Sequence, residues 1–169
     1  MVEPDYQDCL DDRADLRAAF HAAISLFHMS DWVWETHEAT VRANFSLTDR
    51  KSGVVKAPDK SEEFANALEE QYPDFGLIRG IANAAKHLKL KPHGIRPVPN
   101  APRHAANTSV QIEGGGAGYE VGPGGYGQGN WGYAGRPCVV LEGATDTEFS
   151  DIAKAVYQMW QTLRATHGW

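Results

Sequence analysis

Hydrophobic residues recur at helical spacing in four stretches of the chain. The first stretch starts near Asp12, and its apolar positions fall within one arc of the helix surface when each residue advances by about 100°. This helix either ends near Trp34 or continues to about Arg42, because residues 34–44 are polar but contain no Gly or Pro. The apolar positions are Leu16, Phe20, Ala23, Ile24, Phe27 and Trp34.

Two further helices are predicted on either side of Pro73. Residues 48–58 have the composition of a loop, after which either the pair Asp59 and Glu62 or Ser61 caps a short helix that ends at Gln71. The next helix begins near Asp74, and Pro92 and Gly94 end it. The short helix buries Phe64, Ala67 and Leu68; the longer one aligns Phe75, Leu77, Ile78, Ile81, Ala82, Ala85 and Leu88.

The last helix has the clearest pattern. Thr145 and Glu148 have the spacing of a capping box, and an apolar stripe follows them. We therefore expect an amphipathic helix docked on the rest of the chain. Its stripe consists of Phe149, Ile152, Ala153, Val156, Trp160 and Leu163.

Residues 91–143 are too long for a structureless connection inside a compact domain. The β-branched segments 108–113 and 137–142 predict two antiparallel strands, and half of the block 114–135 between them is glycine. We expect the aromatic rings in that block to pack on the helices or on a partner. The predicted fold is therefore mainly α: a single domain, residues 1–169, with a four-helix bundle and a small Gly-rich β-hairpin insert at about 108–142. The aromatic residues of the block are Tyr119, Tyr126, Trp131 and Tyr133.

Composition narrows the possible functions. The 169 residues are 42% hydrophobic, enough to fill one core, and the net charge of -6 argues against nonspecific binding to duplex DNA or to a membrane surface. Cys9 and Cys138 lie far apart without metal-type spacing, and the N-terminal residues are acidic where a signal peptide would be basic and then apolar. We therefore expect a soluble cytoplasmic protein with neither a disulfide nor a metal.

Two patterns in the sequence partly match a dinucleotide-binding loop and a metal site. Gly122, Gly124 and Gly127 match the spacing of a dinucleotide-binding loop, but the residues that follow cannot open a helix, so no cofactor is predicted. His21, His28 and Asp31 share one side of the first helix, and His87 or Asp74 could complete a metal site in a bundle. The Glu-x-x-His pairs of such sites are missing, which favours structural or solvent-edge roles for the histidines.

Asp31 falls inside the apolar stripe of the first helix, so it needs a partner. We expect a cation from the helix that contains Arg79, Asn83 and Lys86 to neutralise it. One interpretation is a buried ion pair that fixes the register of two antiparallel helices. The other is a catalytic or ligand-binding cluster in which His28 or His87 acts as the acid or base.

Together, the segments FHAAISLFHMSDWVW and FGLIRGIANAAKHLKL, the Gly-rich block and the closing helix resemble a group of uncharacterised bacterial helical-bundle proteins that are distantly HEPN-like. The resemblance implies a helical bundle. HEPN ribonucleases carry a closely spaced Arg and His at a composite site that a dimer forms. Here seven residues separate Arg79 from His87, and three separate Arg17 from His21, so both pairs depart from the spacing of that family.

Two functions follow as expectations. The first is a noncatalytic protein-interaction or accessory module, in which the Gly/aromatic block contacts a protein partner or a second copy in a homodimer. The second is a metal-independent ribonuclease, which would contact RNA through Arg79 and His87 with support from the other ionisable groups. These supporting candidates are Asp31, Asn83, Lys86 and His28.

Overall fold

A computed structural model describes residues 2–13, 15–49, 52–86, 108–111, 136–139 and 147–169, with only the backbone at residues 86, 108–111 and 136–139. The described part is mainly helical, as predicted, but it has five helices where the pattern predicted four. The elements in chain order are α1 (Val2–Asp11), α2 (Leu16–Asn44), β1 (Leu47–Thr48), β2 (Val55–Lys56), α3 (Ser61–Gln71), α4 (Pro73–Lys86), β3 (Thr108–Gln111), β4 (Arg136–Val139), β5 (Thr147–Glu148) and α5 (Phe149–His167).

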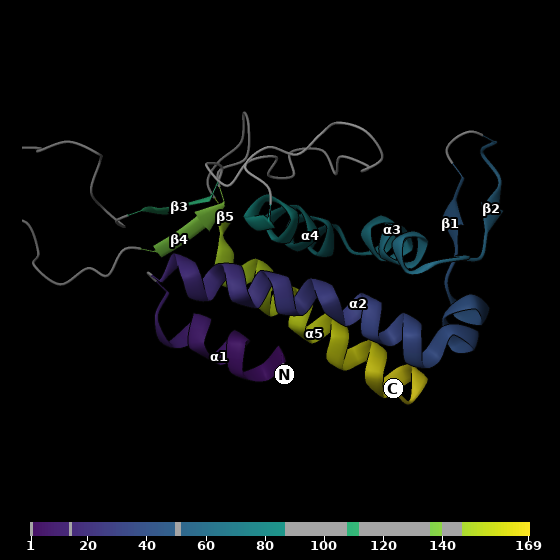
Figure 1. Ribbon diagram of the computed structural model, residues 1–169, viewed down its shortest axis with the longest axis horizontal. Helices are drawn as coiled ribbons and strands as arrows, with labels where there is room; N and C mark the ends of the chain where they lie inside the picture. The colour runs from purple at the N-terminus through teal and green to yellow at the C-terminus, as the bar shows by residue number, and fades with distance from the viewer. Residues whose placement is uncertain (1, 14, 50–51, 87–107, 112–135, 140–146) are drawn as a thin grey trace, which may run out of the picture.

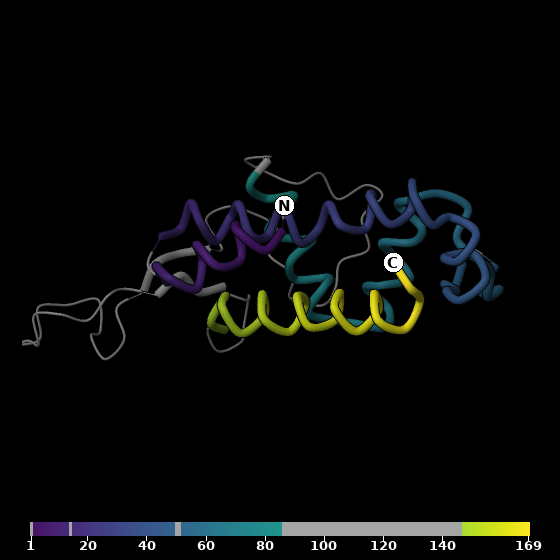
Figure 2. The backbone as a smooth tube through the Cα atoms, turned by 90° about the horizontal axis from the view of Figure 1, so that it is seen from below, coloured from purple at the N-terminus to yellow at the C-terminus, as the bar shows by residue number. Residues whose placement is uncertain are grey.

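The long helix α2 organises the molecule. It runs the length of the body beside α5, and the two helices point in the same direction (Figures 1 and 2). Helices α3 and α4 return along α2 in the opposite direction, and α1 lies against the first half of α2 (Figure 1). The predicted side-by-side, antiparallel packing of the first helix and the Arg79 helix is therefore confirmed.

One hydrophobic cluster contains buried residues from every described helix. The prediction for α5 is confirmed, because all six residues of its apolar stripe are buried. Trp160 of this stripe donates a hydrogen bond from its indole Nε1 to the Leu26 carbonyl at 3.0 Å. A buried indole N–H needs such an acceptor, and this bond fixes α5 against α2.

The buried face of α2 differs from the prediction. Leu16, Phe20, Ile24 and Phe27 are only partly buried. Because α2 packs against α1, α3, α4 and α5, burial is spread over several of its faces. The helix continues to Asn44, with a kink at His37, where φ is -135° and ψ is 30°. The fully buried residues of α2 are Ala19, Ala22, Ala23, Leu26, Ser30, Val33, Trp34 and Val41.

The predicted faces of α3 and α4 are mostly confirmed. Phe64, Ala67 and Leu68 of α3 are fully buried, but in α4 Leu77 is half-buried and Ala85 is exposed. The continuation of this helix to Leu88 and its end at Pro92 and Gly94 lie outside the described residues. The α4 residues Phe75, Ile78, Ile81 and Ala82 are buried as predicted.

The predicted helix caps are wrong in their details. The N-cap of α3 is Lys60, which makes no side-chain capping bond, and it is Glu63 rather than Glu62 that accepts the Asp59 backbone N–H, at 2.9 Å. At α5 the N-cap is Glu148, and its side chain makes no capping bond; Thr145 lies outside the described residues. Both helices therefore begin without the predicted capping boxes.

Four described elements were not predicted, namely α1 and the strands β1, β2 and β5. Helix α1 has few apolar positions and contains Pro4, so its sequence lacks a clear helical stripe. The segment predicted as a loop, residues 48–58, contributes to the antiparallel hairpin β1–β2. Its connecting turn is held by Asp49, whose carboxylate accepts the Ser52 N–H at 2.8 Å, and by Gly53 with φ of 70°, a conformation that favours glycine.

Strand β3 lies within the predicted segment 108–113, and β4 overlaps the predicted segment 137–142 but begins one residue earlier. The two strands pair antiparallel, with Gln111 opposite Arg136 and Thr108 opposite Val139. Strand β5 adds to β4 and leads directly into α5. The Gly-rich block between β3 and β4 lies outside the described residues. Only the pairing at its base is therefore established.

Candidate functional site

The Asp31 side chain of α2 faces the start of α3 rather than Arg79 of α4, while the side chain of Lys86, the other predicted cation, lies outside the described residues. One of its carboxylate oxygens is 2.9 Å from His28 Nδ1, and the other accepts a hydrogen bond from the Ser61 hydroxyl. The Asp31 side chain is 45% exposed, so the predicted burial is wrong. Ser61 is the first residue of α3, where unpaired N–H groups create a partial positive charge that favours an anion.

Arg79 pairs with a residue of α3 instead of Asp31. Its Nη1 donates to Glu69 Oε2 at 2.9 Å and to Asn66 Oδ1 at 2.7 Å. The side chains of Arg79 and Glu69 are each only 6% exposed. The predicted Asp31–Arg79 pair is therefore wrong. Arg79 pairs with Glu69 because Tyr72 alone connects α3 to α4, and this short connection holds the end of α3 beside the start of α4.

Neither cluster has the arrangement of an activated nucleophile. In a Ser-His-Asp triad the hydroxyl donates to the imidazole, which can then remove its proton. Here the Ser61 hydroxyl donates to Asp31, and the same carboxylate also contacts His28. Asp31 can orient the imidazole, but it lies between that imidazole and the hydroxyl. The arrangement therefore joins two helices without providing a nucleophile–base pair.

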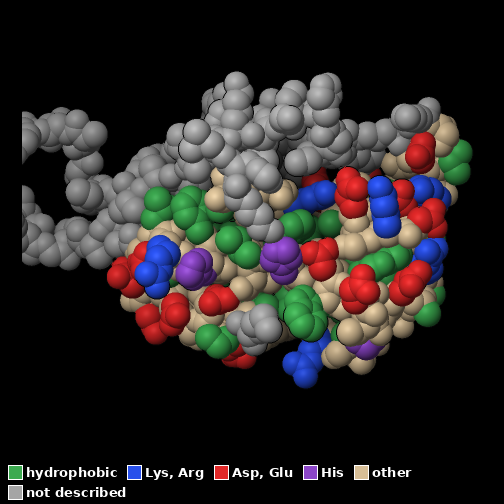
Figure 3. All heavy atoms as spheres, viewed as in Figure 1, with side chains coloured by type: hydrophobic (Ala, Val, Ile, Leu, Met, Phe, Trp, Pro, Cys, Tyr) green, Lys and Arg blue, Asp and Glu red, His purple; other side chains and the backbone are tan. Residues whose placement is uncertain are grey.

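A surface charge network joins β2, the end of α2 and the start of α3. Arg42 donates to Glu38 and Asp59, each at 2.8 Å, and Lys56 Nζ lies 2.8 Å from Glu63 Oε1. Hydrogen bonds from Arg42 and Lys56 lower the pKa of Asp59, and the Lys56 hydrogen bond lowers the pKa of Glu63. Charged side chains gather at this hairpin end of the molecule (Figure 3).

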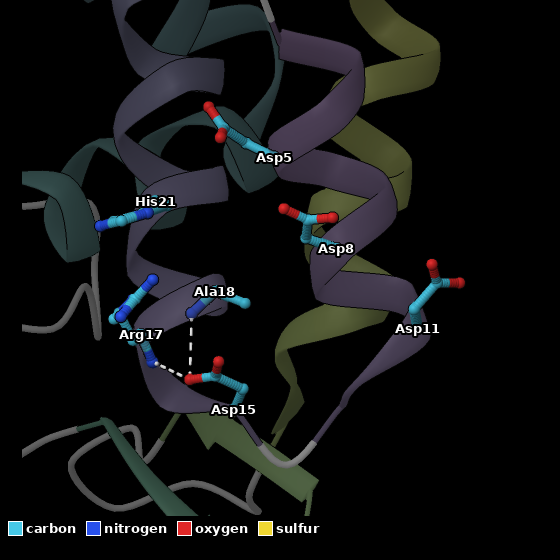
Figure 4. Close-up of a pocket in the computed structure, with 7 residues that line it drawn as sticks. All are labelled: Asp5, Asp8, Asp11, Asp15, Arg17, Ala18 and His21. Atoms are coloured by element: carbon cyan, nitrogen blue, oxygen red, sulfur yellow. Dashed lines mark hydrogen bonds between the residues drawn. The ribbon is translucent and has the colours of Figure 1, made fainter.

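A shallow groove of about 270 Å³ lies between α1 and the start of α2. Asp5 and Asp8 point from α1 toward α2, whereas Asp11 points away (Figure 4). Asp15 caps α2 by accepting the backbone N–H groups of Arg17 and Ala18 at 2.8 and 3.3 Å. One acidic group of this groove, Asp15, therefore already serves to cap the start of α2. Residues lining the groove are Asp5, Asp8, Asp11, Asp15, Arg17, Ala18 and His21.

Trp32 is the most exposed described aromatic residue of α2, with a relative exposure of 58%. Two positions further along, Trp34 is only 8% exposed and lies under the Arg42 guanidinium, whose carbon is 5.5 Å from the ring centroid. The same helix therefore uses one tryptophan in its core and presents the other to solvent. Val54 and Val55 are also exposed, at 59% and 65%, at the hairpin.

Several predicted site residues lie outside the part of the chain that the structure describes. Asn83 is partly buried in α4, but the Lys86 side chain and His87 lie outside the described residues. No group of three or more His, Cys, Asp and Glu side chains in the described ranges is arranged to hold a metal ion. The predicted contact residues Tyr119, Tyr126, Trp131 and Tyr133 also lie outside the described residues.

Sequence reasoning missed Ser61, Asn66 and Glu69, the residues that hold the predicted ionisable groups. A signal for Glu69 exists: it lies in the last turn of α3, and a one-residue connection brings that turn next to Arg79. Neighbouring helices joined by a short loop pack together, so an acid on the last turn of α3 is a better candidate partner than Asp31 on a distant segment. Ser61 carries no comparable signal.

Comparisons of the chain with protein-family models, curated proteins and solved structures gave no match. No helix in the described part of the chain is both long enough and apolar enough to cross a lipid bilayer.

Proposed function

We propose that this chain is a noncatalytic protein-interaction or accessory module. In this proposal, α2–α5 form a four-helix bundle, and the Gly/aromatic hairpin insert is one contact element. The chain pairs with a protein, either a partner or a second copy in a homodimer. The observation that carries the proposal is Trp32, a large aromatic side chain presented on a rigid helix.

Most of the Trp32 side chain faces solvent rather than the core, at 58% exposure. Buried Trp34 already fills the core from the same helix, and Thr36 bonds back to the Trp32 carbonyl at 2.7 Å, so the backbone is regular there. Tryptophan is enriched among the residues that dominate protein–protein binding energy, because its large surface is desolvated at little cost in conformational entropy. A solvent-facing tryptophan therefore supports a contact surface at this turn of α2.

The base of the insert supports the second contact element. Gln111 and Arg136 are paired neighbours, so residues 112–135 leave and return at adjacent positions of one antiparallel pair. This segment is the one with Tyr119, Tyr126, Trp131 and Tyr133. A glycine-rich segment with four aromatic residues, fixed at both ends to the folded body, suits adaptable contact with a protein surface.

Sedimentation velocity over about 1–100 µM tests the homodimer form of the proposal, since this range brackets a micromolar Kd. We expect the chain to self-associate and Trp32→Ala to raise the Kd at least about tenfold. The matched control is Glu35→Ala, an exposed change one turn away on α2. A second variant replaces residues 112–135 with Asn-Gly, a two-residue turn that keeps the β3–β4 register.

Two results would contradict this form of the proposal. One is a monomer over the whole concentration range. The other is association that neither Trp32→Ala nor the turn replacement weakens. Circular dichroism must show unchanged helix content in both variants, so that a loss of association is not a loss of folding.

The alternative proposal is the HEPN-like metal-independent ribonuclease. Its Arg79 would have to bind an RNA phosphate, but the guanidinium is buried and donates to Glu69 and Asn66. We therefore expect no cleavage of single-stranded RNA by purified protein. Cleavage that both Arg79→Ala and His87→Ala abolish, with folding retained, would favour the enzyme over the interaction module.

A further inference from the structure

Helix α1 is the most weakly anchored described helix that packs on the core. It buries only Tyr6 and Cys9 among the ten residues Val2–Asp11. By comparison, α5 buries eight of its 19 residues. Stability in proteins is distributed unevenly, and segments with few buried apolar contacts open at lower free energy than the core.

The charges of α1 also weaken it as a helix. Asp5, Asp8 and Asp11 recur every three residues, and like charges at this spacing repel each other. Asp11 lies at the C-terminal end, where the helix dipole disfavours a carboxylate, and the last turn contains no basic residue. The groove beside these acids supplies only Arg17 and His21 from α2. A ten-residue helix with these charges depends on docking for its stability.

Val2 and Leu10 of α1 pack partly buried against the core, and three more specific features accompany its docking. Tyr6 stacks on Tyr157 of α5 with ring centroids 4.3 Å apart and planes 10° apart. The Ser25 hydroxyl of α2 donates to Asp5. The Cys9 thiol is 1% exposed, and burial raises its pKa to about 11. Loss of docking would therefore convert an inert, buried thiol into one that reagents can reach.

We propose that α1 is a separable cover helix, which undocks as a unit from α2 and α5 while the core of α2–α5 stays folded. Undocking exposes the Tyr157 face of α5 and the Ser25 face of α2. This inference is independent of the proposed interaction function, because it concerns an opening of the chain itself.

Alkylation of Cys9 by iodoacetamide measures this opening in a Cys138→Ser background, in which Cys9 is the only cysteine. We expect labelling in buffer to be faster than global unfolding allows, and to respond only weakly to low denaturant because little surface is exposed. Tyr6→Ala removes the stacked ring and should speed labelling at least about tenfold. The denaturant midpoint of the helical core, followed by circular dichroism, should move little.

Leu163→Ala is the matched control, because it removes a buried side chain near the C-terminal end of α5, beyond Tyr157. It should lower the denaturant midpoint and leave the labelling rate in buffer unchanged. The proposal is overturned if Cys9 labelling follows global unfolding at every denaturant concentration. It is also overturned if Leu163→Ala speeds labelling as much as Tyr6→Ala does. If Tyr6→Ala fails to fold, the denaturant dependence of the Cys138→Ser protein alone decides.

Discussion

Two ionic contacts involving α3 lie in very different surroundings. The Arg79–Glu69 pair between α3 and α4 is almost completely buried, with 6% exposure on each side. The Asp31–His28 pair of α2, which also binds Ser61 of α3, is 45% and 40% exposed. The first contact has replaced water by protein groups, whereas the second keeps much of its hydration.

The difference determines how strongly the fold depends on each pair. Removing one partner of a buried pair leaves an uncompensated charge in a medium of low polarity. Removing one partner of a half-exposed pair lets water take its place. The α3–α4 connection is therefore sensitive to single substitutions, and the α2–α3 connection is tolerant of them.

Arg79→Ala tests the sensitive region. It removes the buried guanidinium that donates to the Glu69 carboxylate and to the Asn66 side chain between α3 and α4. We expect the free energy of unfolding to fall by about 3–5 kcal/mol in urea denaturation at neutral pH. A loss below about 1 kcal/mol would mean that water enters and solvates Glu69, and the contrast between the two regions would disappear.

The double variant Arg79→Met/Glu69→Leu sharpens the comparison, because it removes both charges and fills similar volume with apolar groups. We expect it to recover most of the stability lost in Arg79→Ala, since buried ion pairs are often replaceable by packed hydrophobic residues. Glu69→Leu alone should be destabilising, because it removes the carboxylate that neutralises the buried Arg79 guanidinium. Equal losses in the double variant and in Arg79→Ala would assign the effect to packing rather than charge.

Most of the helical fold could be predicted from the sequence. The stripe of α5 was clear because its buried residues face one neighbouring core. The predicted burial of Leu16 and Phe20 was wrong, because α2 packs against four other helices and no single apolar stripe describes which of its residues are buried. Helix α1 was missed because its acidic sequence holds little helical signal, and its docking depends on Tyr6 meeting Tyr157 of α5.

The ionic partners could not be predicted with the same success. Helical periodicity placed Arg79 correctly near the core, but it could not give the angle between α3 and α4 that brings Glu69 to it. Asp31 was assigned to the core on the same argument. The structure shows that its carboxylate reaches the start of α3, where it accepts a hydrogen bond from the Ser61 hydroxyl.

Asp31→Ala tests the tolerant region. It removes the hydrogen bond from Ser61, the contact with His28 and an anion at the start of α3. We expect a loss of about 1 kcal/mol or less in the free energy of unfolding, because the group is half-exposed. Asp31→Asn keeps the size and should recover part of the loss. A loss near that of Arg79→Ala would show that the fold depends on this contact as strongly as it depends on the buried pair.

The smallest expected effect concerns the surface network, and it is visible through pH. The Lys56 hydrogen bond lowers the pKa of Glu63 in the folded chain, so this contact stabilises the fold above the ordinary glutamate value of about 4.3. The stabilisation is lost as the pH falls through the lowered value. Glu63→Gln should therefore cost about 0.5 kcal/mol at pH 7, and the difference from wild type should shrink toward pH 3. Glu62→Gln removes a carboxylate from the same first turn of α3, together with its exposed ion pair with Lys60 and without touching Lys56. Subtracting its effect therefore removes at least the helix-dipole share from the Glu63→Gln loss. The result that would contradict this prediction is a Glu63→Gln loss, after subtraction of the Glu62→Gln loss, that is the same at pH 7 and pH 3. The Lys56–Glu63 contact would then contribute nothing to the stability of the fold.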